Sequence, residues 1–189
     1  MEEKIIYYEK PGKDNTDETL TLVAERAQAR GISRVVLAST RGDTARAALA
    51  AFGGTDIRLV VVPWQFGFGD KQPFPQELVS ELESNSHRVH FSTMLFHTED
   101  FYGVKAPWPM ATILRTFSQG VKVCVEITLM SCDGGLVDEG EKVIAVAGSG
   151  AGADTAIVVT CAPSTRVSKL RIHEIICKPL NESRGAAGA

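Results

Sequence analysis

Short apolar runs alternate with segments of helical periodicity along most of this 189-residue chain. Strand-like runs at 4–8, 34–39, 57–63 and 88–94 are separated by helix-like segments at 15–30, 43–52 and 75–85. Such alternation predicts right-handed βαβ crossovers and a sheet that helices cover on both faces. We therefore expect one α/β domain over residues 1–180, a three-layer α/β/α sandwich, followed by a flexible tail at 181–189.

The second half of the chain departs from this regular alternation. Helical segments are expected at 109–117 and 119–132, and the latter is apolar almost all round, as a central buried helix would be. Strands at 143–147 and 156–160 are joined by only eight residues, too few for a parallel crossover. They should be antiparallel neighbours, so we expect a mixed, mostly parallel sheet with one antiparallel strand. The run at 170–178 closes the fold as a strand or a short helix.

A loop of small and hydroxyl residues joins the apolar run at 34–39 to the next helix. Hydroxyls, a glycine backbone and a helix N-terminus together favour phosphate oxygens, with an arginine as charge partner. The candidate ligand-binding residues in this loop are Ser39, Thr40, Arg41, Gly42 and Thr44. The alternative is that Asp43 or Thr44 merely caps the helix.

A second loop, between the apolar runs at 143–147 and 156–160, is rich in glycine. It superficially matches the dinucleotide fingerprint, but a strand-like run follows where that motif needs a helix. A Walker A loop is excluded because no Gly-Lys-Ser/Thr is present. The loop either cradles a ligand or forms a plain hairpin. Its candidate ligand-binding residues are Gly148, Ser149, Gly150, Gly152, Asp154 and Thr155.

Several polar residues outside the two loops have alternative interpretations. Asn15 and Lys13, like Arg115 and Gln119, lie beside breaks and either line the ligand site or tie loops down. Glu126, inside the apolar helix, either acts with Asp133 as a pair of buried acids or forms an ion pair with Lys122 one turn earlier. His97 follows the run at 88–94, on the side of the sheet where ligands bind in such folds.

Composition excludes several classes of protein. A net charge of −3 with no basic block argues against a nucleic-acid partner, and no apolar run approaches the ~20 residues of a membrane helix. We expect no membrane association, a cytoplasmic location and a homo-oligomer. The cysteines have no zinc-site spacing, so no metal is expected and all four should be core residues: Cys124, Cys132, Cys161 and Cys177.

Both loops resemble those of a known domain. The run 39–45 resembles the Thr/Ser-x-x-Gly-x-Ser/Thr-Ala phosphate loop of the pyruvate kinase C-terminal domain, and the run 148–155 is placed like its late glycine-rich loop. The chain is more similar still to a family of stand-alone proteins with a pyruvate kinase C-terminal-like α/β fold. The segments that carry this resemblance are 9–12, 15–16, 18–20, 38–40, 114–115, 119–123, 126–127 and 152–156.

The resemblance implies a site for a phosphorylated small molecule. In many pyruvate kinases these loops hold fructose 1,6-bisphosphate, but this chain lacks the Trp/Arg-rich contacts of the late loop, so that effector is not expected. Pyruvate kinase activity is not expected either, because 189 residues leave no room for the catalytic barrel domain. A sugar phosphate, or a mononucleotide such as flavin mononucleotide, would suit the phosphate loop and the aromatic residues Trp64, Phe66 and Phe68.

Two other classes of function stay open. The same pocket could be an enzyme's active site with Glu126, His97 or Lys13 as an added acid or base, although no residue is assigned a catalytic role. Alternatively, the chain could be a purely structural or oligomerisation domain.

Overall fold

The computed structural model describes residues 3–98 and 106–180, so the expected tail at 181–189 lies outside the described residues. Seven strands form one sheet in the order β1-β7-β6-β5-β2-β3-β4. Among them β6 alone runs antiparallel to its neighbours, which confirms the predicted mixed sheet with one reversed strand. The strands are β1 (Ile6–Tyr8), β2 (Arg34–Ala38), β3 (Arg58–Val62), β4 (Arg88–Val89), β5 (Lys142–Ala147), β6 (Thr155–Thr160) and β7 (Arg171–Pro179).

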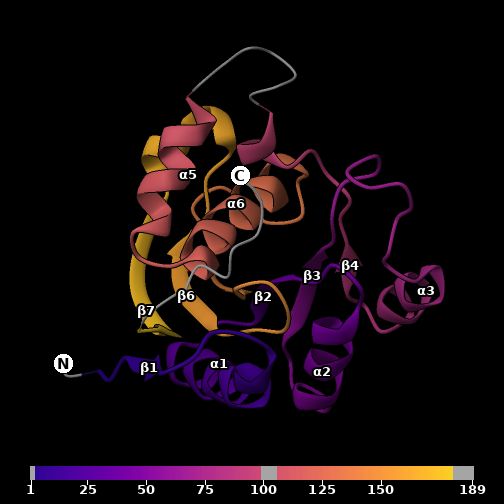
Figure 1. The fold of residues 1–189 in the computed structure, drawn as a ribbon. Coiled ribbons are helices and arrows are strands. Elements are labelled where there is room, and N and C mark those ends of the chain that lie inside the picture. The colour runs from indigo at the N-terminus through magenta and orange to yellow at the C-terminus, as the bar shows by residue number, and fades with distance from the viewer. Residues whose placement is uncertain (1–2, 99–105, 181–189) are drawn as a thin grey trace.

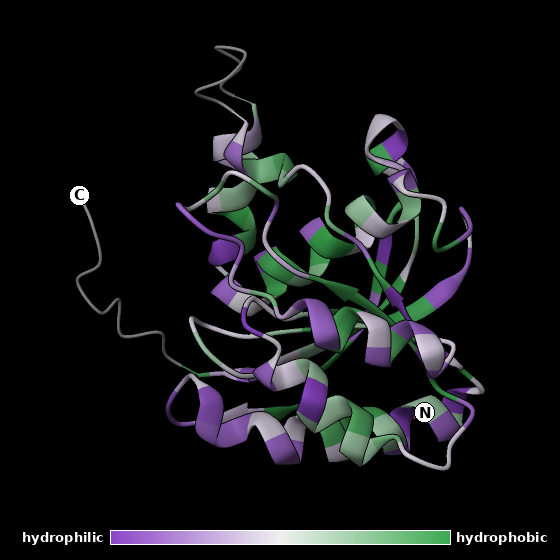
Figure 2. Ribbon diagram, turned by 90° about the vertical axis from the view of Figure 1, so that its right-hand side faces the viewer, coloured by the Kyte–Doolittle hydropathy of each residue, from purple (hydrophilic) through white to green (hydrophobic). Residues whose placement is uncertain are grey.

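Helices cover both faces of the sheet, so the predicted three layers are confirmed (Figure 1). One layer contains α1 (Thr16–Arg30), α2 (Asp43–Ala51) and α3 (Gln76–Ser84), and the other contains α5 (Pro107–Arg115) and α6 (Gln119–Asp133). Alternate residues of β2 face the two layers, since Val35 and Leu37 pack into the first core and Val36 into the second. In Figure 2 hydrophobic stretches accordingly gather where the helices meet the sheet.

Helix α6 is the central buried helix that its composition predicts. It begins at the N-cap Ser118, whose side chain accepts a hydrogen bond from the Val121 backbone N–H at 3.0 Å. Its second residue, Gly120, lies so close to β6 that an added Cβ would be 2.0 Å from Thr155 Oγ1. Only glycine permits this approach, which holds α6 directly on the sheet.

Some elements differ in extent from the sequence prediction. Strand β4 has two residues because, after Val89, only the His90 N–H continues the pairing, donating to the Val61 carbonyl at 2.8 Å. The last segment is a strand, β7, because it pairs with β6 through two register shifts and then with β1. None of the helices in the described ranges is both long and apolar enough to cross a membrane.

Candidate functional site

A cavity of about 310 Å³ opens at the carboxyl ends of the parallel strands β2, β3 and β5. The loops that follow these strands form one side of it, and α6 forms the opposite wall. Ligands bind at this edge in open α/β sheets, because helix N-termini and loops converge there. The two loops singled out from the sequence therefore meet at one cavity.

The first loop contributes Ser39, Thr40, Arg41 and Thr44 to the cavity lining. The Ser39 hydroxyl accepts a hydrogen bond from the Ala45 backbone N–H at 3.2 Å and so satisfies one N–H group in the first turn of α2. Neither Asp43 nor Thr44 caps α2, whose N-cap is Gly42, so the capping alternative is wrong for both. Gly42 does not line the cavity. Its φ is 92°, and a Cβ added to it would be 2.6 Å from Leu78 Cδ2, so the turn needs glycine here for its conformation and its packing.

The second loop lines the cavity with three glycines, Gly148, Gly150 and Gly152. Asp154 is fully buried beneath the loop, where its Oδ2 accepts from the backbone N–H groups of Gly12 at 2.8 Å and Ser149 at 3.0 Å. Thr155 donates its hydroxyl to Asp154 Oδ1 at 2.8 Å. Ser149, Asp154 and Thr155 thus lie outside the cavity lining, and Asp154 shapes the loop from behind.

The chain segment around Asn15 supports this second loop. The Asn15 Nδ2 donates to the backbone carbonyls of Lys10 at 2.8 Å and Gly12 at 3.2 Å. Lys13 packs closely against Gly152, where an added Cβ would be 2.4 Å from its Cα. Neither Asn15 nor Lys13 lines the cavity. Of their two interpretations, the structure therefore supports the one in which they hold loops together.

Helix α6 places a buried ion pair in the opposite wall. Lys122 Nζ lies 2.5 Å from Glu126 Oε2, and both side chains are at most 4% exposed, which confirms the predicted i,i+4 pair. Glu126 Oε1 accepts from the Phe96 backbone N–H at 2.8 Å and lies 3.4 Å from His97 Nδ1. Asp133, the other proposed partner, instead accepts from the Ser164 N–H at the far end of the helix.

The surroundings of Glu126 keep it ionised. Burial alone would raise the pKa of this carboxyl group, but His97, the positive charge of Lys122 and the Phe96 N–H outweigh it and hold the pKa below its ordinary value. The Lys122 ammonium also lies 5.3 Å from the centre of the Phe96 ring, a favourable cation–π position. The cavity wall therefore contains a carboxylate and an ammonium group whose opposite charges compensate each other.

Aromatic residues line the cavity between the loops and this wall. Trp64 and Phe68, from the segment after β3, pack edge to face with ring centres 4.9 Å apart. Phe68 also contacts the His97 ring in an edge-to-face arrangement at 5.4 Å. Phe66, which the sequence groups with them, instead packs against Phe91 outside the cavity lining.

His97 and Glu126, two of the three suggested acid or base residues, therefore reach the cavity together. Sequence reasoning missed that Lys122 also lines it. The available signal was the spacing of Gln119, Lys122 and Glu126, the polar face of an otherwise apolar helix. Gln119 lines the cavity and accepts a hydrogen bond from Arg115 Nε at 2.8 Å.

The four cysteines lie in the hydrophobic core or pack against it. Cys124, Cys161 and Cys177 are buried and Cys132 is partly buried, and burial raises the pKa of each thiol. This agrees with their expected place in the core. In the ranges 3–98 and 106–180, no three His, Cys, Asp or Glu side chains group closely enough to hold a metal ion.

No family model matches the chain. Three solved structures similar to it are Cryptosporidium parvum pyruvate kinases, one of them in complex with ADP. Their sequence identities to the chain are 14%, 14% and 13%, and their TM-scores are 0.43, 0.43 and 0.42. The matches cover 78% of this chain but only 23%, 24% and 22% of the pyruvate kinase chains. The chain thus spans less than a quarter of the pyruvate kinases that it matches, and it is similar to a part of them.

Proposed function

We propose that the cavity binds a phosphorylated small molecule, with the phosphate at the 39–44 loop. The observation that carries this proposal is the convergence of both glycine-containing loops on one cavity at the carboxyl ends of three parallel strands. Thr40, Thr44 and Arg41 line the cavity here, next to the N-terminus of the nine-residue helix α2. Hydroxyl donors, a guanidinium group and unpaired helical N–H groups are the partners that phosphate oxygens favour.

The rest of the cavity suits a flat, partly apolar group. Trp64 and Phe68 line it from the loop side, while Val123 and Ile127 line it from α6. A volume of about 310 Å³ lies at the small end of the range of ligand pockets, roughly 300–1,000 Å³. A mononucleotide such as flavin mononucleotide offers a phosphate at one end and a planar ring at the other, so it is the first ligand to test.

A purely structural role is less well supported. In that case side chains of the two loops should fill the space between them, whereas an open cavity lies there, lined by Gly148, Gly150 and Gly152, and a Cβ added at Gly150 would meet nothing within 4 Å. The enzyme alternative gains one observation, since the ionisable side chains of Lys122, Glu126 and His97 line the same cavity.

Titration with flavin mononucleotide, followed by quenching of the flavin fluorescence, tests the proposal. We expect saturable binding that Thr44→Val weakens about 10- to 100-fold, because a hydrogen bond to a charged group is worth about 1.5–3 kcal/mol. Thr21→Val, on the exposed side of α1, is the matched control and should bind as the wild type does.

Two further outcomes separate the ligand from the site. Absence of binding at high micromolar flavin mononucleotide would exclude this ligand, and mass spectrometry of molecules released on denaturation would then identify another phosphate ester. If Thr44→Val binds the same ligand with unchanged affinity, the 39–44 loop is not the phosphate site.

A further inference from the structure

We propose that the cavity is an active site in which His97 moves a proton to or from the bound phosphorylated molecule, with Glu126 and Lys122 as positioning residues. His97 acts on the molecule whose binding is proposed for this cavity, so its role rests on that proposed function. The substrate class is a phosphate ester that carries an exchangeable proton on a hydroxyl group or on a carbon beside a carbonyl.

His97 has the placement that an acid or base requires. It ends the short 3₁₀ helix η2 (Leu95–His97), lines the cavity and is one-third exposed, so a bound molecule can reach its ring. Glu126 Oε1 lies 3.4 Å from Nδ1, and a carboxylate at this nitrogen favours the tautomer with the proton on Nδ1. The lone pair then lies on Nε2, which becomes the proton acceptor.

Glu126 is itself held in place to perform this task. The oxygen that faces His97 also accepts the Phe96 backbone N–H at 2.8 Å, so the residue next to His97 in the chain fixes the carboxylate. Phe68 packs against the His97 ring at 5.4 Å and restricts its rotation. Two contacts from different segments thus orient the same imidazole.

Lys122 explains how the carboxylate stays charged at this depth. The wall around Glu126 includes Val123, Ile127 and Met130, and an isolated carboxylate would be strongly destabilised there. Lys122 Nζ, 2.5 Å from the second carboxylate oxygen, supplies the compensating charge. A buried ion pair contributes less to stability than apolar residues of similar volume often do, so its position in the cavity wall favours a functional role.

The reaction step needs no group that the protein lacks. Nε2 of neutral His97 takes the proton from the O–H or C–H bond, the electron pair of that bond stays on the substrate, and the ring becomes an imidazolium cation. The Glu126 carboxylate stabilises this cation through Nδ1–H. The proton then returns to the same atom or to a neighbouring one, which gives exchange or isomerisation with no oxidant or reductant.

The first test reads the tautomer directly. In ¹H–¹⁵N long-range spectra of histidine-labelled protein, the signals that His97→Gln removes belong to His97. We expect the neutral ring to carry its proton on Nδ1 in the wild type. Lys122→Met/Glu126→Leu removes both charges together with the oxygen that faces Nδ1, and it should shift the His97 signals toward the other tautomer. A wild-type ring protonated on Nε2, or a tautomer that this double variant leaves unchanged, would overturn the proposal.

The second test reads the chemistry. The protein is incubated in D₂O with the phosphate-ester fraction of a cell extract, and mass spectrometry follows deuterium uptake and conversion. We expect the wild type to exchange or convert at least one compound, and His97→Gln to do so about 10²- to 10⁴-fold more slowly. His173→Gln is the matched control, because His173 lies on β7 and pairs with Thr160 at 2.7 Å.

Ligand binding by the same proteins separates the two proposals. Flavin mononucleotide or another identified ligand that binds to His97→Gln with unchanged affinity, together with lost turnover, supports the catalytic role. A wild type that binds but neither exchanges nor converts any compound overturns the catalytic role and leaves the binding function intact. Wild-type turnover by His97→Gln also overturns it.

Discussion

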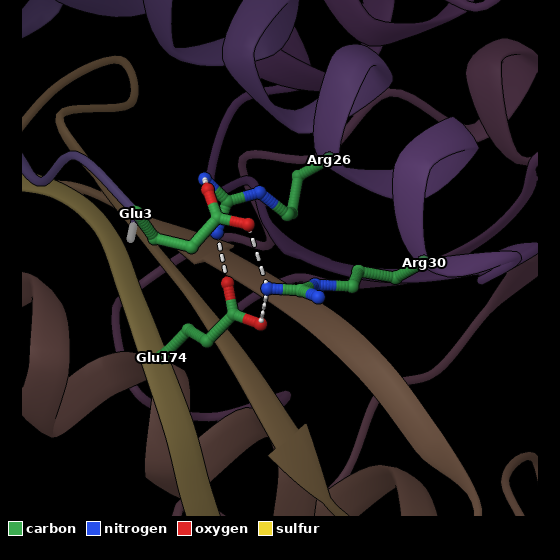
Figure 3. A network of polar contacts seen from close by, with 4 residues as sticks. All are labelled: Glu3, Arg26, Arg30 and Glu174. Carbon is green, nitrogen blue, oxygen red and sulfur yellow. Dashed lines mark hydrogen bonds and ion pairs between the residues drawn. The ribbon is translucent and has the colours of Figure 1, made fainter. Parts of the chain in front are cut away.

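Two clusters of opposite charges differ in what surrounds them. In the first, Arg26 and Arg30 of α1 both reach Glu3, ahead of β1, and Glu174 of β7 (Figure 3). These four side chains are 13–41% exposed, and Glu3 and Arg26 line a second cavity. In the second cluster, Lys122 and Glu126 pair within one helix and are almost completely buried.

Ion pairs of similar length therefore have different consequences in the two clusters. Water and salt reach the charges of the first cluster in part, so each of its pairs should contribute less than the buried pair, and together they tie an edge of the sheet to α1. In the second cluster the charges have lost their hydration, so each depends on the other. Four measurements test this contrast between the clusters.

The largest effect is expected for Lys122→Met. Removal of one partner of a buried pair leaves an uncompensated charge and should cost about 3–5 kcal/mol of the free energy of unfolding. Lys122→Met/Glu126→Gln should recover most of this loss, because Gln still accepts the Phe96 N–H and carries no charge. Urea denaturation measures all three proteins. A loss below about 1 kcal/mol for Lys122→Met would place the pair in the same class as the exposed cluster.

A second large effect is expected for Asp154→Ala, which tests a buried carboxylate held by N–H groups instead of a cation. The backbone N–H groups of Gly12 and Ser149 lose their acceptor, and each unsatisfied group costs about 1–3 kcal/mol. The exposed Asp70→Ala is the control and should be close to neutral. Thermal unfolding measures both variants, and equal melting temperatures for Asp154→Ala and Asp70→Ala would contradict the prediction.

Acid should act on the buried cluster through Glu126. Because the folded-state pKa lies below the ordinary value of 4.5, the stabilisation is complete above that value and is lost as the pH falls through the folded pKa. The wild type should therefore lose stability below pH 4.5 more steeply than Glu126→Gln. Denaturation series at pH values on both sides of 4.5 measure this slope, and parallel curves would show that Glu126 gains nothing from its partners.

The smallest effect is expected for Arg30→Gln in the partly exposed cluster. Arg30 lies 2.8 Å from a carboxylate oxygen of Glu3 and 2.8 Å from one of Glu174, and ion pairs that water reaches are worth about 0.2–1 kcal/mol each. The difference from the wild type should shrink at about 1 M salt, where screening acts within a few ångströms. A loss as large as that of Lys122→Met, insensitive to salt, would remove the contrast between the clusters.

Local sequence determined most of the fold. Apolar runs without alternation marked the strands covered on both faces, and the short connection between the runs at 143–147 and 156–160 was enough to predict the reversed strand. The length of β4 and the strand conformation of β7 could not be read in this way. They depend on hydrogen bonds with strands distant in the sequence, such as that from His90 to Val61.

The candidate site was predictable in its loops and less so in its wall. The chemistry of residues 39–44 and the glycines of the second loop were visible in the sequence. The polar groups of Asp154 and Asn15 suit a ligand-binding role, but both form hydrogen bonds with the backbone instead. Asp154 accepts from the N–H of Gly12, which is distant in the sequence, and Asn15 donates to the carbonyl of Lys10 in the preceding turn. Which face of α6 meets the cavity, and that His97 reaches Glu126, follow from tertiary packing alone.

The contact between Gly120 and Thr155 has a consequence for how this site could change. A Cβ atom at residue 120 would collide with Thr155 of β6. The short distance between α6 and the sheet therefore depends on a glycine at this position. Larger residues there would push Lys122 and Glu126 away from the glycine loops, so the pocket would become wider and not fuller. Gly120 thus sets the width of the cavity, although it is not one of the lining residues.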